Sequence, residues 1–167
     1  MSFYDGTAPL FTHSLIALSK VLAKGEAHAK EQGIAPEVLL NARLFPNMFS
    51  LTRQVQLACD FSGKACARLA GAEVPSTPDT ETTFEHLQQR IAKTIEGIKA
   101  IPAAKYEGGD KRDVTFATGK DTTKTLPGQQ FLNHVALPNF FFHCATAYDI
   151  LRHNGVALGK LDFLGAN

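Results

Sequence analysis

The chain has 167 residues, of which 44% are hydrophobic and 20% charged, a composition that fits one globular domain and excludes a disordered chain. Its 17 basic and 16 acidic side chains leave a formal charge of +1, so charge gives no support for binding nucleic acid or an anionic membrane. No run of about 18 apolar residues is present, and residues 1–11 lack the features of a secretion signal. We therefore expect one cytoplasmic domain over residues 1–167 that does not enter a membrane.

The first predicted element is a long amphipathic helix over residues 8–32. Thr7 stands at its N-cap position, and Gly33 follows its last residue, where a left-handed cap favours glycine. Apolar and small residues recur at intervals of three and four, which places them on one helix face. They are Phe11, Leu15, Leu18, Leu22, Gly25 and Ala29. A single helical turn is then expected over residues 36–40.

Two further helices follow on either side of a proline-containing loop. The second is predicted over residues 47–70 and ends before Gly71. The third is predicted to start at a capping box formed by Thr82 and Glu85 and to end near Ala100. Each carries one apolar stripe: Met48, Leu51, Val55, Ala58, Ser62, Ala65 and Leu69 in the second helix, and Phe84, Leu87, Ile91, Ile95, Ile98 and Ile101 in the third.

Between Tyr106 and Leu126 the residue pattern changes from helical to alternating. β-branched residues flank a turn at residues 119–121, which predicts a small hairpin. A last helix is expected over residues 128–153. Pro138 should kink or restart this helix, because its ring clashes with the carbonyl group four residues earlier.

Four striped helices in a chain of this length predict an all-α protein, a four-helix bundle with the hairpin inserted before the last helix. The periodicity also predicts which side chains form its core. These are Leu15, Leu18, Val55, Ala58, Ile91, Ile98, Phe140 and Ala147. The three cysteines, Cys59, Cys66 and Cys144, are an odd number, which argues against a disulfide framework and predicts buried thiols.

His143 is the most informative polar residue, because it falls on the inward stripe of the last helix. It is either a core histidine with satisfied nitrogens or a pocket base or metal ligand. Asn139 stands one turn earlier, and Gln54 flanks the stripe of the second helix, where it could orient a polar ligand or His143 itself. We take His143, Asn139 and Gln54 as the candidate ligand-pocket residues. The chain has no Gly-x-Ser-x-Gly nucleophile motif and no phosphate-binding loop.

Two long segments resemble the signatures of an uncharacterised domain family in the DinB/YfiT-like superfamily. They read LLNARLFPNMFSLTRQVQLACDFSGKACARLAG and LPNFFFHCATAYDILRHNGVALGKLDFLG, and SFYD near the start also fits. The resemblance implies a single antiparallel four-helix bundle that commonly forms homodimers. It also implies a site at which three histidines hold a divalent metal in relatives that include thiol-dependent transferases.

The metal-ligand positions of that superfamily fall on Gln54, Asn139 and His143 here, so two of the three depart from the histidine pattern. Amide oxygens are weak ligands for zinc or nickel, and we therefore expect no cofactor and no tightly bound divalent ion. Whether the chain is an enzyme stays open. The leading hypothesis is a small-molecule pocket centred on His143, between the second and last helices. The alternative is a non-catalytic homodimeric bundle that has lost the ancestral site, with Phe141, Phe142 or Phe163 at its interface.

Overall fold

The computed structural model describes residues 2–166; Met1 and Asn167, the ends of the predicted domain, lie outside the described residues. The chain is mostly helical, with one small antiparallel sheet. Its elements in order are α1 (Ala8–Glu31), α2 (Pro36–Leu40), α3 (Leu51–Ala70), α4 (Phe84–Lys99), the 3₁₀ turn η1 (Ala103–Tyr106), β1 (Asp113–Ala117), β2 (Thr123–Pro127), α5 (Gly128–Phe131), the π-helical turn η2 (Leu132–Ala136), α6 (Leu137–His153) and α7 (Lys160–Leu164). Over residues 2–166, no helix is long and apolar enough to cross a membrane.

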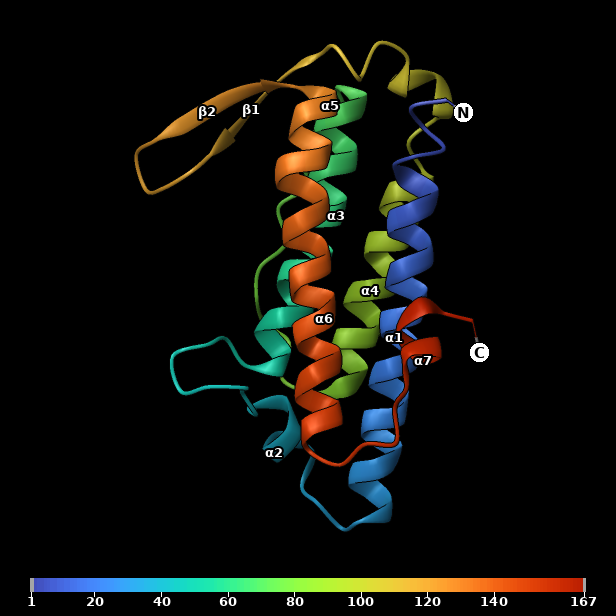
Figure 1. Cartoon of the computed structure of the whole chain (residues 1–167), viewed down its shortest axis with the longest axis vertical. Coiled ribbons are helices and arrows are strands. Elements are labelled where there is room, and N and C mark those ends of the chain that lie inside the picture. Colours follow the sequence, from blue (N-terminus) through green and yellow to red (C-terminus); the bar gives the residue numbers. More distant parts are fainter. Residues whose placement is uncertain (1, 167) are drawn as a thin grey trace.

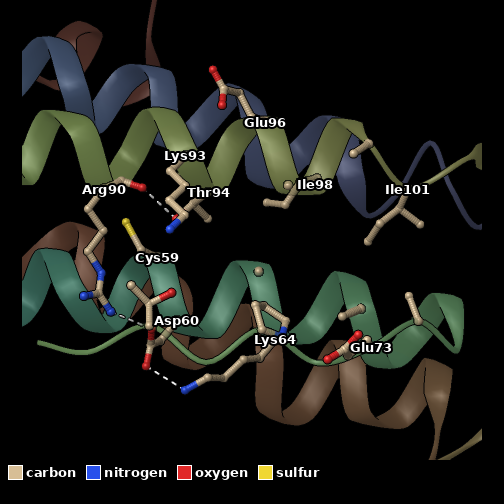
Figure 2. A pocket seen from close by; sticks show the side chains of 17 residues that line it. Cys59, Asp60, Lys64, Glu73, Arg90, Lys93, Thr94, Glu96, Ile98 and Ile101 are labelled. Atoms are coloured by element: carbon tan, nitrogen blue, oxygen red, sulfur yellow. Dashed lines mark hydrogen bonds and ion pairs between the residues drawn. The ribbon is translucent and has the colours of Figure 1, made fainter.

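The long helices α1, α3, α4 and α6 lie alongside one another (Figure 1). Helix α3 packs between α6 and α4, and α1 packs against α4. Helices α3 and α4 run in the same direction, because the connection over residues 71–83 returns along them before α4 begins (Figures 1 and 2). This pair therefore departs from the antiparallel order that we expected. We refer to residues 71–83 as the crossover.

Two predicted helix starts are wrong by one to four residues. Helix α3 begins at Leu51 rather than Asn47, because the preceding residues form a turn and the Leu51 amide donates to the Ala42 carbonyl. Helix α4 is capped by Thr83, whose hydroxyl accepts from the His86 amide at 3.1 Å, and not by Thr82. Local capping signals locate a helix end only to within a few residues when neighbouring residues can serve equally well.

The predicted hairpin is present, and the last helix is irregular near Pro138, although as a π-helical turn rather than a restart. Strands β1 and β2 pair antiparallel with Val114 opposite Leu126. Near Pro138 the last helix widens into the π-helical turn η2, so α5, η2 and α6 form one continuous but irregular helix. Proline has no N–H and its ring crowds the carbonyl one turn earlier, and the wider turn relieves this clash. The irregularity sits directly before the turn of α6 that carries His143.

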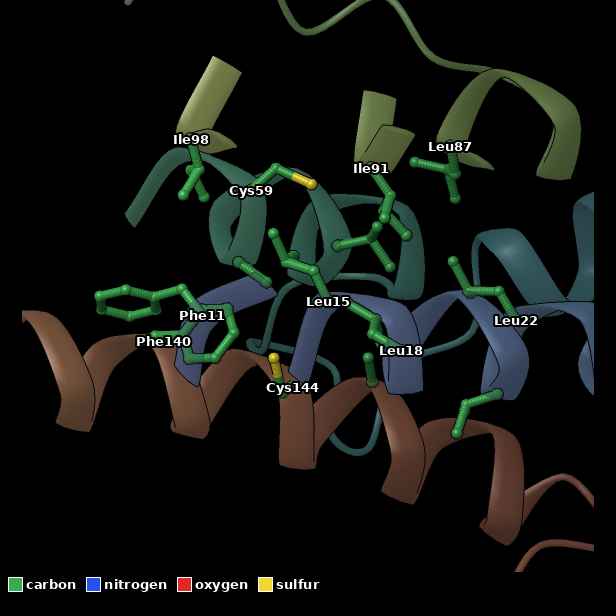
Figure 3. Packing of buried hydrophobic residues seen from close by; sticks show 14 of the residues in the cluster. Phe11, Leu15, Leu18, Leu22, Cys59, Leu87, Ile91, Ile98, Phe140 and Cys144 are labelled. Atoms are coloured by element: carbon green, nitrogen blue, oxygen red, sulfur yellow. The ribbon is translucent and has the colours of Figure 1, made fainter. Parts of the chain in front are cut away.

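The hydrophobic core lies between the long helices (Figure 3). The predicted core residues are confirmed, since none of them is more than 4% exposed. They are Leu15, Leu18, Val55, Ala58, Ile91, Ile98, Phe140 and Ala147. Phe11 of α1 meets Phe140 of α6 edge to face, with ring centroids 4.9 Å apart. Local periodicity is therefore sufficient here to identify the buried face of each long helix.

Replacing Ile91 by alanine tests whether α4 contributes to this core. Ile91 is 1% exposed, so Ile91→Ala should lower the free energy of unfolding by about 2–5 kcal/mol. The measurement is urea unfolding followed by circular dichroism. Ile16→Ala is the matched control, because Ile16 is 43% exposed and should lose less than about 1 kcal/mol. An equally small loss for Ile91→Ala would show that α4 is not packed in the core.

Candidate functional site

The structure brings His143 of α6 into contact with Gln54 of α3. His143 Nδ1 lies 2.7 Å from Gln54 Oε1, and the two residues are 7% and 1% exposed. The Gln54 amide nitrogen donates to the Phe49 carbonyl at 3.2 Å. Because a carbonyl can only accept, this contact directs Gln54 Oε1 toward the imidazole, and His143 Nδ1 must carry the proton. Gln54 thus selects one tautomer of His143.

In the tautomer selected by Gln54, His143 Nε2 carries a free lone pair. Within residues 2–166, Nε2 has no hydrogen-bond partner, and the side-chain nitrogen and oxygen atoms that are both buried and unpaired are Arg90 Nε and Tyr106 Oη. His143 Nε2 is therefore not completely shielded from solvent, although the residue is only 7% exposed. An imidazole held in this way offers a single acceptor close to the protein surface.

Aromatic rings surround His143 and keep it neutral. Phe61 stacks on the imidazole with centroids 5.5 Å apart, and Phe142 meets it edge-on at 5.3 Å. Burial, followed by the positive charge of Arg53, lowers the pKa of His143 to about 4. At neutral pH the ring is uncharged, so it accepts hydrogen bonds but is a weak base.

Asn139 does not join this pair. Its side-chain nitrogen donates to the Val135 carbonyl of its own helix at 2.7 Å, where the π-helical turn η2 disturbs the regular backbone pairing. The described residues 2–166 contain no group of three or more histidine, cysteine, aspartate or glutamate side chains that could hold a metal ion. The divalent metal implied by the family resemblance does not fit here. The Gln54 side-chain oxygen already accepts a hydrogen bond from His143, and Gln54 and Asn139 offer only amide oxygens, which are weak metal ligands.

A buried arginine on the other side of α3 was missed by the sequence analysis. Arg90 of α4 is 4% exposed, and its guanidinium contacts Glu81, Asp60 and Asp79 at 3.0, 2.7 and 3.1 Å. It also donates to the Pro78 carbonyl at 3.0 Å. The signal was available, because Arg90 falls between Leu87 and Ile91 on the apolar stripe of its helix.

The Arg90 cluster reaches the neighbourhood of His143 through α3. Gln56 donates to Glu81 at 2.9 Å, and Arg53 contacts both Asp79 and Gln56. Burial alone raises the pKa of Glu81, but hydrogen bonds from the backbone, Arg90 and Gln56 outweigh it, and the pKa is lowered. The crossover is thereby tied to the helix turn that presents Gln54.

The cysteines supply no nucleophile. Cys59, Cys66 and Cys144 are free and buried, as the sequence predicts. Burial raises the pKa of Cys59 and of Cys66 to about 12 and that of Cys144 also upward, so all three stay protonated at neutral pH. Thiol chemistry is therefore not available from this chain's own cysteines.

Comparison with known proteins shows which family the chain belongs to. Residues 3–164 match the model of a family described as a domain of unknown function, DUF1993. A crystal structure of a DinB family member protein from Shewanella denitrificans is similar to the chain, with a TM-score of 0.91 and 39% sequence identity. The match covers 98% of this chain and 92% of that one. No curated protein matches.

The Arg90 cluster gives a stability prediction that depends on pH. Arg90→Met should cost about 3–5 kcal/mol at neutral pH, because it leaves the largely buried carboxylates of Asp60 and Glu81 without their cation. Since the folded pKa of Glu81 is below its usual 4.5, this contribution is present above pH 4.5 and is lost as the pH falls through the folded pKa. The difference in the free energy of unfolding between the wild type and Arg90→Met should therefore become smaller at acidic pH.

The measurement is urea unfolding of both proteins at a series of pH values. Lys99→Met serves as the control, since this exposed lysine lies on the same helix and should change stability by less than about 0.5 kcal/mol at any pH. A cost for Arg90→Met that does not change between neutral and acidic pH would contradict the assignment of Glu81 as a charged partner.

Proposed function

Because the chain belongs to the DUF1993 family and shares the fold of a DinB family member, we propose that it is a DinB-type four-helix bundle that binds a small molecule at His143. The observation that supports this most directly is the contact between Gln54 and His143. It holds the imidazole in one tautomer and leaves the Nε2 lone pair without a partner in residues 2–166. A purely structural core histidine would instead have both nitrogens satisfied within the protein.

The surroundings of His143 define the ligand chemistry. Phe142 and Phe49 are 55% and 53% exposed, and the Arg53 guanidinium lies over the Phe49 ring at 5.9 Å. A ligand at this position meets an apolar rim and one hydrogen-bond acceptor. The favoured ligand is therefore a small molecule with an apolar body and an O–H or N–H donor that reaches His143 Nε2.

The same chemistry favours binding over acid–base catalysis. A general base works best when its pKa lies near the working pH, and that of His143 is lowered to about 4. In this proposal the relation to metalloenzymes is ancestral, since Gln54 and Asn139 occupy positions where histidines would hold the metal. Gln54 instead orients His143, and Asn139 stabilises the turn below it.

Phenol and anisole form a matched pair that tests the proposal. Phenol carries the donor that His143 Nε2 requires, and anisole replaces it with a methyl ether. Phenol should bind with a dissociation constant in the millimolar range, at least about fivefold more tightly than anisole. Nitrogen-15 NMR of His143 is the measurement, because accepting a hydrogen bond moves the Nε2 signal and leaves Nδ1 protonated.

Gln54→Leu is the companion variant to this titration. It removes the acceptor that selects the Nδ1–H tautomer, so the proton should redistribute to Nε2 and phenol binding should weaken. Circular dichroism checks that the variant keeps its helices. Equal binding of phenol and anisole, or unchanged phenol binding by Gln54→Leu, would reject His143 as the ligand-binding group.

Metal analysis tests whether the His143 site binds a divalent metal ion. Protein purified without chelator should carry well under one equivalent of divalent ion by mass spectrometry, because one imidazole and two amides are a poor donor set. A double variant, Gln54→His with Asn139→His, supplies the missing imidazoles and should gain zinc. One full equivalent in the wild type that is lost in His143→Ala would overturn this expectation.

A non-catalytic homodimer is the second candidate, and the exposed Phe142 favours it. Large exposed apolar side chains commonly mark interfaces, and a symmetric dimer would bury the same patch from both copies. Phe163, by contrast, packs against Tyr148 with ring centroids 5.9 Å apart and is partly buried within its own chain.

Analytical ultracentrifugation at micromolar concentration measures this association. Phe142→Glu should shift a dimer toward monomer and keep the helicity unchanged, because it places a charge at the contact without disturbing the core. Phe163→Glu is the comparison, since it should reduce helical stability rather than association. A wild-type protein that sediments as a single monomeric species would eliminate the dimer.

A further inference from the structure

A cavity of about 500 Å³ lies on the opposite side of α3 from His143. It is lined by α3, α4 and the crossover and is partly open to solvent, and Figure 2 shows the side chains that line it. Neither His143, Gln54 nor Asn139 contributes to its wall. The volume lies within the range of sites for small organic molecules, about 300–1,000 Å³.

Two helical glycines keep this cavity open. Gly63 of α3 and Gly97 of α4 both line it. A Cβ atom built on Gly97 would meet nothing within 4 Å, and one on Gly63 would lie 3.5 Å from the Thr94 methyl group. Glycine is less favourable than alanine inside a helix, so neither residue serves helix formation. Their small size is what leaves the space between α3 and α4 unfilled.

The wall of the cavity is largely apolar along its length. Ile98 and Ile101 line it from the α4 side (Figure 2), and Ala67 of α3 and Pro75 of the crossover also line it. Cys59 also lines the cavity. Burial raises the pKa of its thiol to about 12, so the thiol is uncharged at neutral pH and adds to the apolar wall. An occupant would therefore have a predominantly hydrocarbon body.

The polar groups gather at the end of the cavity where Arg90 reaches across to Asp60 (Figure 2). Asp60 is neutralised there by Arg90 and by Lys64, whose ammonium lies 2.7 Å from its carboxylate. Lys93 also lines this end, and it has no hydrogen-bond or ion-pair partner in the part of the chain that the structure describes. The unpaired charge at this end is therefore positive.

The other two acidic residues that line the cavity, Glu73 and Glu96, lie away from this end. Glu73 lies toward the far end, and the Glu96 side chain extends away from the gap between the helices (Figure 2). Lys93 and Ile101 are eight positions apart on the α4 side, which corresponds to roughly 12 Å at a rise of about 1.5 Å per residue. An anionic group and an apolar chain of that length match the cavity.

We propose that the cavity binds a small organic carboxylate, with the carboxylate paired to Lys93 and the hydrocarbon body lying along Ile98 and Ile101. The crossover forms one wall of the cavity. Within the described chain, residues 73–77 make no hydrogen bond, whereas the Ala72 amide donates to Ala67 and Pro78 accepts from Arg90. This part of the wall can therefore shift between these two anchors without breaking a hydrogen bond.

Isothermal titration with decanoate tests the proposal. Decanol is the uncharged probe, and it is titrated in the His143→Ala background, which removes the hydroxyl-binding group of the first proposed site. The wild type should bind decanoate at a single saturable site. Gly97→Leu should weaken binding at least about tenfold, because its side chain enters the cavity. Lys93→Gln should weaken decanoate at least about fivefold and leave decanol unchanged. Lys30→Gln, an exposed lysine on α1, and His143→Ala should leave decanoate binding unchanged.

The variants also separate loss of binding from loss of folding. Gly97→Ala introduces only a methyl group into open space and should raise the melting temperature while it keeps decanoate binding within about twofold. Gly97→Leu must retain the wild-type helicity by circular dichroism. The proposal is overturned if decanoate shows no saturable binding at millimolar concentration, or if folded Gly97→Leu binds it as the wild type does. Equal sensitivity of decanoate and decanol to Lys93→Gln would overturn the assignment of the carboxylate.

Discussion

The Arg90 guanidinium is surrounded by carboxylates from α3 and from the crossover, and this cluster holds α4, α3 and the returning chain together. A buried cation is tolerated only when its charge is balanced by nearby anions. Asp60, Asp79 and Glu81 provide that balance. The parallel pairing of α3 with α4 positions both the cavity and the helix turn that carries Gln54, so both candidate sites depend on this one arrangement.

On the other side of α3, one amide sets the chemistry of the His143 site. Gln54 accepts a hydrogen bond from His143 and so fixes the imidazole tautomer. The result is a neutral imidazole with one unpaired acceptor atom in residues 2–166, which is why the proposed function is small-molecule binding.

The two proposed sites differ in how they meet a ligand. His143 presents a directed polar atom within an exposed apolar rim, and it suits a donor group. The cavity between α3 and α4 presents a long apolar wall with the Lys93 ammonium at one end, and it suits an anion with a hydrocarbon body. Because no wall residue is shared, substitutions at His143 and at Gly97 can be used to examine each site separately.

The sequence by itself determined the buried faces of the long helices, the hairpin and the irregularity at Pro138. Each of these follows from local physics: helical periodicity, β-branched alternation and the missing proline N–H. The sequence also identified His143, from its position on the apolar stripe of the last helix, and Gln54, which flanks the stripe of the second helix. A contact between the two was one of the alternatives that it predicted. Only the tertiary structure decided that Arg90 is buried among carboxylates and that a cavity opens beside Gly97, because charge balance and unfilled volume arise from residues that are distant in the chain.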